Sequence, residues 1–168
     1  MASTKITVPP NDEPSLDFLR DLVSQGKLDD AVSFCAYLLG RRECVWWACK
    51  SVRRLISAIP NAELEALEAA EAWVRDPSPE ERQAAQEAAT RANQDKATTW
   101  AAYAAAWSGG ALVFGRSAPV APPPELTPHA AAVAIMLAAG GYLSPDERTA
   151  QLKACVEDGA RLAETGLS

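Results

Sequence analysis

The sequence predicts an all-α protein of about seven or eight helices, arranged as a single-domain bundle or irregular array. Alanine makes up about a fifth of the 168 residues, and it is the best helix former because it loses no side-chain entropy. Apolar residues recur at helical spacing, and glycine or proline separates the resulting segments. The length fits one domain with one core, which we place at residues 15–168 after an irregular leader at residues 1–14.

The first three predicted helices are separated by glycines and closed by a proline. The segment SLDFLRDLVSQG (15–26) places aliphatic side chains on one face and ends at Gly26, which suits the position after a helix. The segment KLDDAVSFCAYLLG (27–40) repeats this pattern and ends at the next glycine. A third helix is predicted over about residues 41–58, because Pro60 closes it.

Helix-capping residues begin two of the next three predicted helices. Asn61 can cap a fourth helix, AELEALEAAEAWVRD. In the segment DPSPEER that follows, Ser78 is a favoured N-cap and Pro79 suits the first helical position. A fifth helix is therefore predicted over about residues 79–93. A sixth, over about residues 97–108, ends at two glycines.

The longest predicted loop lies at residues 109–125. Its sequence, GGALVFGRSAPVAPPPE, holds three glycines and four prolines, which no helix can cross. Thr127 and Pro128 begin a seventh helix that ends at the next pair of glycines. The segment SPDE, which starts at Ser144, begins an eighth helix that runs toward residue 164.

Two helix starts nearly coincide in sequence. The segments SPEERQAAQEA (78–88) and SPDERTAQLKA (144–154) share a serine, a proline, a glutamate, an arginine and two alanines. Two interpretations stay open. Both segments are simply good helix caps, or the chain contains a duplicated helical hairpin like those of helical repeat proteins. No regular period is visible along the chain, so an ordinary solenoid is not supported.

The net charge and the cysteine pattern narrow the classes of partner and the cellular compartment that we expect for this protein. The net charge is −6, which disfavours nucleic acid as a partner because phosphate binding needs a positive field. No apolar run approaches the roughly 18 residues of a membrane-spanning helix, and no secretory signal is visible. The four cysteines form no C-x-x-C pair and are expected to be small buried thiols in a reducing cytosol. We therefore predict a cytoplasmic protein without membrane insertion.

The third predicted helix, RRECVWWACKSVRRL, places two tryptophans side by side. Neighbouring helical residues point about 100° apart, so Trp46 and Trp47 lie on the two flanks of an apolar stripe. Either neighbouring helices bury both rings, or one ring lies exposed beside Arg53 or Arg54. Tryptophan and arginine together are enriched at protein-binding hot spots. We predict that at least one of the two rings is substantially buried within the chain.

The sixth predicted helix carries an aromatic stripe. Trp100, Tyr103 and Trp107 stand at positions i, i+3 and i+7 of a segment otherwise rich in alanine. Such a stripe is either part of the core or the wall of a groove that receives a partner helix. The candidate partner-binding residues are therefore Trp46, Trp47, Arg53, Arg54, Trp100, Tyr103 and Trp107.

The sequence holds no recognisable catalytic or metal-binding set. His129, the single histidine, lacks an H-x-x-x-H or H-E-x-x-H context, and no G-x-S-x-G or G-x-x-x-x-G-K-[ST] segment occurs. The glutamates of the fourth helix lack the Glu-x-x-His pairing of di-iron proteins and predict a solvated acidic face; they are Glu63, Glu65, Glu68 and Glu71. We predict no enzymatic activity, no cofactor and no bound metal.

Three stretches carry a family resemblance: V-W-W-A at Val45 to Ala48, E-A-W-V-R-D-P-S at Glu71 to Ser78, and W-S-G-G at Trp107 to Gly110. Together they resemble a bacterial family of alanine- and tryptophan-rich domains of unknown function, associated with type VI secretion gene clusters. The resemblance spans residues 35–140. It implies an accessory role, as adaptor or effector chaperone, in a contact-dependent secretion apparatus.

A shorter stretch resembles a second class of protein. The segment WWACKSVRRL, followed by EAAEAWVRD, is similar to helical toxin-immunity proteins. This resemblance implies a cytosolic protein that binds and blocks a toxin. Neither resemblance supplies catalytic residues. The sequence thus predicts a protein-binding module whose partner is a secreted effector, a spike component or a toxin, and it makes no prediction of oligomeric state.

Overall fold

The computed structural model describes residues 15–112, 116, 118–142 and 144–167. The described residues form eight helices and, apart from one isolated bridge, no β-structure. The helices are α1 (Ser15–Ser24), α2 (Leu28–Leu38), α3 (Arg41–Leu55), α4 (Asn61–Arg75), α5 (Pro79–Arg91), α6 (Ala97–Ala106), α7 (Leu126–Ala139) and α8 (Pro145–Thr165). The prediction of an all-α fold with about eight helices is confirmed.

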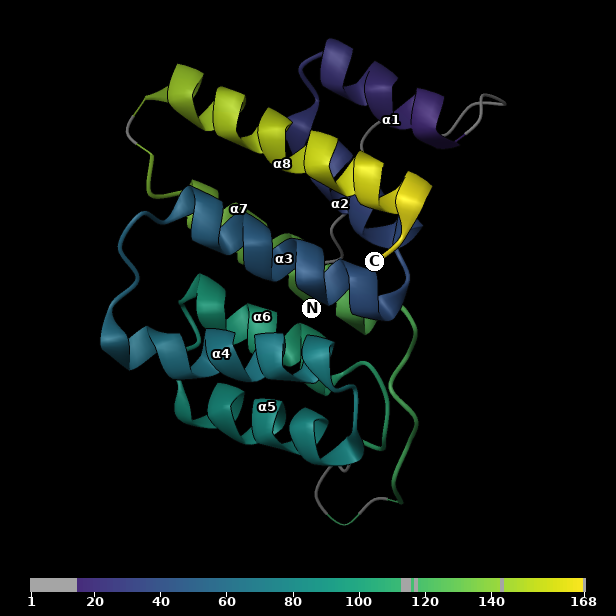
Figure 1. Cartoon of the computed structure of the whole chain (residues 1–168), viewed down its shortest axis with the longest axis vertical. Helices are drawn as coiled ribbons and strands as arrows, with labels where there is room; N and C mark the ends of the chain where they lie inside the picture. The colour runs from purple at the N-terminus through teal and green to yellow at the C-terminus, as the bar shows by residue number, and fades with distance from the viewer. Residues whose placement is uncertain (1–14, 113–115, 117, 143, 168) are drawn as a thin grey trace.

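Helices α3 and α7 lie in the middle of the molecule, between two groups of helices (Figure 1). α3 packs against α4, α6, α7 and α8, and α7 packs against α2, α3 and α6. Helices α1, α2 and α8 lie on one side of this central pair, and α4, α5 and α6 lie on the other. Helix α3, which carries Trp46 and Trp47, is therefore covered from several directions, as its broad apolar surface requires.

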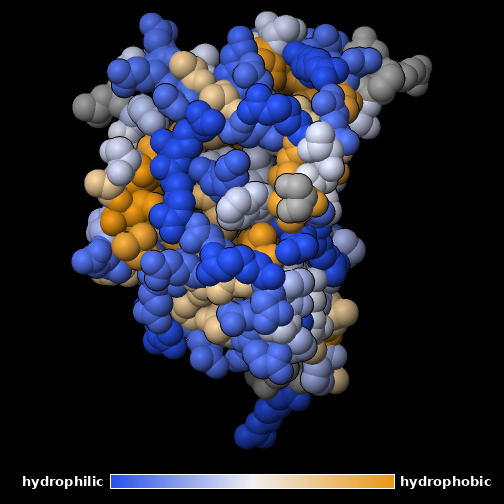
Figure 2. Space-filling view, viewed as in Figure 1, coloured by the Kyte–Doolittle hydropathy of each residue, from blue (hydrophilic) through white to orange (hydrophobic). Residues whose placement is uncertain are grey.

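One hydrophobic core takes buried side chains from all eight helices. Alanine supplies most of the buried surface of α6 and α7, and these two helices pack closely because a methyl side chain lets their backbones approach. Larger side chains such as Leu67, Ile135 and Leu152 fill the remaining interior. On the face seen in Figure 2, hydrophilic side chains cover most of the surface, and apolar surface shows only as separate patches.

Both predicted serine caps are present. The Ser78 Oγ accepts a hydrogen bond of 3.2 Å from the Glu81 N–H, and the Ser144 Oγ accepts one of 3.3 Å from the Glu147 N–H. α5 then packs on α4 and α6, whereas α8 packs on α2 and α3 and has little contact with α7. Because the partners of the two helices differ, the shared sequence marks two similar helix starts and not two equivalent hairpins.

Several predicted helix boundaries shift by a few residues. Asn61 is the first residue of α4 and not its cap, because Pro60 takes the capping position with ψ 145°. α3 ends at Leu55, before the predicted end near residue 58, and Ile56 is extended, with φ −113° and ψ 106°. α6 ends at Ala106, two residues before the predicted end.

The predicted loop at residues 109–125 separates α6 from α7. Leu112 and Val120 form an isolated antiparallel bridge across it, with N···O distances of 2.7 and 2.8 Å. The predicted leader at residues 1–14 lies outside the described residues. None of the helices that the structure describes is long and apolar enough to span a bilayer.

Candidate functional site

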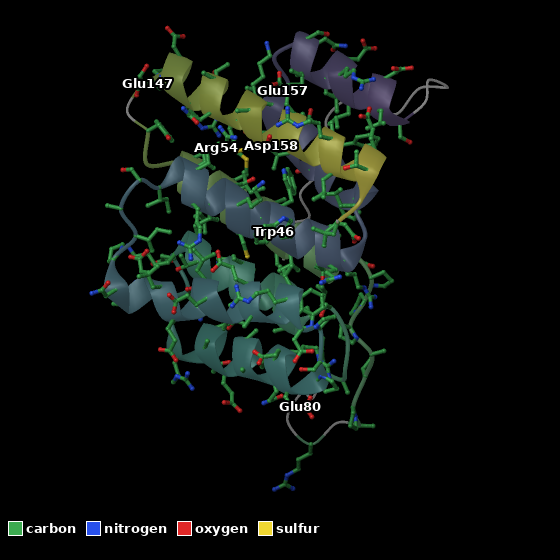
Figure 3. All side chains as sticks on the ribbon, in the orientation of Figure 1. Trp46, Arg54, Glu80, Glu147, Glu157 and Asp158 are labelled. Carbon is green, nitrogen blue, oxygen red and sulfur yellow. The ribbon has the colours of Figure 1, made fainter. Side chains whose placement is uncertain are left out.

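The adjacent tryptophans of α3 have different environments. Trp47 is 2% exposed, and its indole N–H donates a hydrogen bond of 2.8 Å to the carbonyl of Cys155 on α8. Trp46 is only partly buried, and the Lys50 Nζ lies 5.9 Å from the centroid of its ring (Figure 3). The prediction that at least one ring is buried is confirmed, and of the two only Trp46 offers surface to a partner.

The two arginines near the end of α3 pair with carboxylates of neighbouring helices. Arg53 donates two hydrogen bonds, of 2.5 and 2.8 Å, to Glu71 on α4. Arg54 lies beside Asp158 of α8, at 2.8 Å, in the space between α3 and α8 (Figure 3). Asp158 also pairs with Arg161. Both arginines of α3 therefore make contacts within the chain, one with α4 and one with α8, while their side chains stay 44% and 42% exposed.

The acidic face of α4 departs from the prediction at one residue. Glu65 and Glu68 are exposed, but Glu71 is 9% exposed and accepts both hydrogen bonds from Arg53. The prediction of a solvated carboxylate is wrong for Glu71, because α3 packs against this face and supplies a guanidinium. A buried carboxylate needs such a partner. The hydrogen bond to Glu71 also raises the pKa of Arg53.

Replacement of Arg53 by methionine is expected to lower the free energy of unfolding by about 1 kcal/mol, because Glu71 loses its partner. The cost stays moderate because the side chain of Arg53 is 44% exposed and water can reach the carboxylate. Urea unfolding measures the change. The matched control is the substitution Arg91→Met. Arg91 pairs with Glu65, whose side chain is 70% exposed, so this substitution should change stability by less than about 0.5 kcal/mol. Equal effects of the two substitutions would contradict the role of Glu71 burial.

The four cysteines are free and buried, as predicted. They lie on α2, α3 and α8 and are Cys35, Cys44, Cys49 and Cys155. Burial raises the pKa of Cys35 to about 12 and also raises the pKa of the other three thiols. A thiol held in its neutral form is a poor nucleophile and a poor metal ligand. Within the described residues, no group of three or more His, Cys, Asp or Glu side chains could hold a metal ion.

In the native protein, none of the four thiols is expected to react rapidly with a thiol-specific reagent such as DTNB. All four should react once urea unfolds the chain. The time course of absorbance in native and unfolded samples measures this difference. A rapid stoichiometric reaction of one cysteine in the native state would show an accessible thiolate and would contradict the burial described above.

The aromatic stripe of α6 forms a connected cluster. The rings of Tyr103 and Trp107 stack with centroids 4.8 Å apart and an interplanar angle of 22°. The ring of Trp100 meets Trp107 edge-on, at 6.1 Å and 76°, and its N–H donates to the carbonyl of Gln94 at 2.9 Å. His129 of α7 makes an edge contact with Trp100, and burial lowers the pKa of His129. The rings of Trp100 and Tyr103 on α6 and of Trp107, the residue that follows the helix, are only partly buried.

A cavity of about 540 Å³ opens beside this cluster. We call it the aromatic groove. Its lining comes from α5, α6 and the segments that follow them, and consists of Arg82, Gln83, Gln86, Gln94, Trp100, Tyr103, Ala106, Trp107, Gly109, Ala111, Leu112 and Leu126. The opposite surface of α6 is built of alanine and threonine and packs against α4, α5 and α7. The stripe therefore faces the groove because the small side chains occupy the tightly packed side.

Three polar groups in the aromatic groove make no hydrogen bond to any residue that the structure describes. They are the guanidinium of Arg82, the hydroxyl of Tyr103 and the indole N–H of Trp107. Arg82 packs directly over Gly110, where a Cβ would lie within 2.7–2.9 Å of its guanidinium. Gly110 also has a φ of +73°, which favours glycine. The groove thus combines aromatic ring surface with hydrogen-bond donors that remain available to a ligand.

The sequence pattern identified the aromatic residues of this site but not the polar residues of α5. The spacing of Trp100, Tyr103 and Trp107 predicted either a core stripe or a groove wall, whereas Arg82 stood out only as part of a helix start. A usable signal was present, because Arg82 and Gln86 stand four residues apart and so share a face of α5. Nothing in the sequence showed that this face would lie beside the aromatic stripe.

Comparison with known proteins identifies a family and no characterised relative. No curated protein and no solved structure matches the chain. Residues 18–163 match the family DUF6931, which is described as a family of unknown function. The match contains the whole of α2 to α7 and most of α1 and α8. It confirms the predicted membership of a domain family of unknown function: the chain belongs to the DUF6931 family.

Proposed function

We propose that this protein is a non-catalytic module that binds another protein through the aromatic groove. The carrying observation is the combination, around one cavity of about 540 Å³, of three partly exposed aromatic rings with three hydrogen-bond donors that have no acceptor among the described residues. Tryptophan, tyrosine and arginine dominate the energetics of protein interfaces, because each buries a large area and offers a polar group. The groove has all three types, contributed by Trp100, Trp107, Tyr103 and Arg82.

We further propose that the partner belongs to a type VI secretion pathway, as a secreted effector or a spike component. The support is the resemblance of three stretches of the chain to a family associated with such gene clusters. In this role the protein is an adaptor or effector chaperone in the cytoplasm. An apolar groove with polar donors suits it, because a chaperone covers an apolar segment of its cargo until the cargo is delivered.

The absence of enzymatic activity is part of the proposal. Buried thiols with raised pKa values do not supply a nucleophile. The single histidine lies against Trp100. The chain sequence contains none of the nucleophile, metal-ligand or phosphate-binding motifs searched for above.

A pull-down from the native host tests the proposal. We expect wild-type protein to retain a spike or effector protein whose secretion fails when the gene for this chain is deleted. Tyr103→Ala and Arg82→Glu, each placed in the aromatic groove, should lose that partner while keeping a helical circular dichroism spectrum. Tyr37→Ala is the matched control, because Tyr37 is 49% exposed and lies outside the groove. Retention of the same partner by all variants would refute binding through the groove.

A second candidate function, inhibition of a toxin, is favoured by the acidic surface. The net charge is −6, and exposed carboxylates stand on well-separated helices, such as Glu80 on α5 and Glu147 and Glu157 on α8 (Figure 3). An immunity protein of this kind would block a positively charged active site. Rescue of cells from one co-encoded toxin, abolished by charge reversal at these carboxylates and not by Arg82→Glu, would support this function over the first.

A further inference from the structure

The lining of the aromatic groove also indicates the kind of segment that it binds, an inference that rests on the proposed function. We propose that the groove binds an extended, proline-rich segment of a partner protein, and that an acidic residue of this segment pairs with Arg82. Three features of the lining lead to this ligand: the arrangement of the rings, the unpaired donors, and the distribution of charge.

The rings form a surface suited to proline. Tyr103 and Trp107 stack with centroids 4.8 Å apart, and Trp100 stands edge-on to Trp107. Proline-rich segments adopt an extended left-handed helix whose rings dock into grooves lined by aromatic side chains. Such a segment is ordered before it binds, so little conformational entropy is lost on binding.

The unpaired donors distinguish an extended ligand from a helical one. The indole N–H of Trp107 and the hydroxyl of Tyr103 make no hydrogen bond to a described residue. A bound α-helix suits them less well, because each carbonyl along its length already accepts a hydrogen bond from one of its own N–H groups. An extended proline-rich segment has no internal hydrogen bonds, so its carbonyls are free to accept from both donors. Burying these donors without acceptors would weaken binding.

The charges of the groove favour an acidic ligand. The chain carries 22 acidic and 16 basic residues, yet the lining of the aromatic groove holds one arginine and no carboxylate. Arg82 makes no ion pair with a described residue, whereas other arginines, such as Arg53, Arg54 and Arg148, have carboxylate partners. A partner carboxylate would therefore meet a guanidinium that is not already paired, and an arginine–carboxylate pair can be bidentate.

The glutamines of α5 complete the recognition surface. The amide nitrogen of Gln83 donates to Glu87 and that of Gln86 donates to Thr90, each at 3.3 Å. Their side-chain carbonyls remain as acceptors beside the aromatic rings. They suit the few N–H groups of a proline-rich segment, which come from the residues between the prolines.

The test uses the full chain and three synthetic peptides with blocked ends. The first is proline-rich with one central glutamate, the second has lysine at that position, and the third is a helix-forming peptide with one glutamate. Intrinsic tryptophan fluorescence reports binding, because Trp100 and Trp107 line the groove. We expect saturable binding of the first peptide and binding about tenfold weaker for the lysine peptide, the value for the loss of one charge-assisted hydrogen bond.

Conservative variants assign the effect to the groove. Arg82→Gln should abolish the preference for glutamate over lysine, and Tyr103→Phe should weaken binding of the proline-rich peptide about fivefold by removing one donor. The matched controls are Arg75→Gln and Tyr37→Phe, exposed residues outside the groove, which should bind both peptides as the wild type does. Circular dichroism spectra should be unchanged in all four variants.

Several results would overturn the inference. Tighter binding of the helical peptide would show that the groove receives a helix. A glutamate preference that survives in Arg82→Gln would remove the role assigned to Arg82. Sedimentation velocity tests a third outcome. If the chain forms a dimer that the groove variants lose and the proline-rich peptide dissociates, the groove binds residues 118–125 of a second copy and not a foreign partner.

The same experiments separate this inference from the proposed function. If the host partner is lost from the groove variants but no proline-rich peptide binds, the proposed function stands and this inference alone fails. If the peptides bind as expected but no host protein depends on the groove, the function fails instead.

Discussion

Replacement of Trp47 by alanine is expected to lower the free energy of unfolding by about 3–5 kcal/mol, the usual cost of removing a large aromatic side chain from a core. Trp47 is 2% exposed, and its loss leaves a cavity and removes the hydrogen bond of 2.8 Å that its indole N–H donates to the carbonyl of Cys155. Small domains are stable by only about 5–15 kcal/mol, so this one substitution would remove a large fraction of the stability.

Urea unfolding followed by circular dichroism measures this change, and the neighbouring tryptophan provides the control. Trp46 is partly buried and its ring lies under Lys50 at the surface. Trp46→Ala should cost less than half as much as Trp47→Ala, because less of its ring leaves contact with the core. Similar losses at the two positions would mean that both rings contribute equally to the core, contrary to the asymmetry described here.

Replacement of Gly159 by alanine is the second large effect, with an expected loss of about 1–3 kcal/mol from overpacking. Gly159 lies inside α8, where alanine would normally stabilise a helix by about 1 kcal/mol. A Cβ at this position would overlap the Cys35 Sγ and would lie 2.8 Å from the Trp47 Nε1. Because the backbone of α8 rests directly on the Trp47 ring, neither atom can move aside without disturbing the core.

Two further variants isolate the packing effect at Gly159. Ala163 is exposed on the same helix, and Ala163→Gly should cost about 1 kcal/mol through helix propensity alone. In a Cys35→Ala background, Gly159→Ala should cost less than in the wild type, since one of the overlapping atoms is gone. Thermal unfolding of the wild type, the three single variants and the Cys35→Ala, Gly159→Ala double variant gives the comparison. A stabilising effect of Gly159→Ala would show that α8 can move away from α3 freely.

Trp47 and Gly159 explain why the adjacent tryptophans need not serve a common purpose. Trp47 anchors α8 to α3 through its hydrogen bond to Cys155. Its ring lies against the backbone of α8 at Gly159, and glycine is the only residue type that leaves room for an indole there. The contribution of Trp47 to stability is therefore enough to explain why a tryptophan stands at this position. Trp46, Trp100 and Trp107 are only partly buried and keep ring surface for contact with another molecule.

Local sequence signals account for the helices and for most of their boundaries. Alanine content, the serine caps at Ser78 and Ser144, and the glycines and prolines between segments are local signals, and they act within a few residues of where they stand. The loop at residues 109–125 followed from the same chemistry. The aromatic stripe of α6 was also visible, because helical spacing is a property of a single segment.

Only the tertiary structure decided which of these surfaces is buried, since helical periodicity gives the direction of a side chain and not the neighbour that covers it. Trp46 and Trp47 flank the same apolar stripe, yet α8 covers only Trp47, through a glycine more than a hundred residues away. Glu71 belongs to an acidic face by sequence but is neutralised by Arg53, since α3 packs against α4. The aromatic groove exists because α5 brings Arg82 beside the stripe of α6, and such long-range packing depends on the shapes of whole helices rather than on any local pattern.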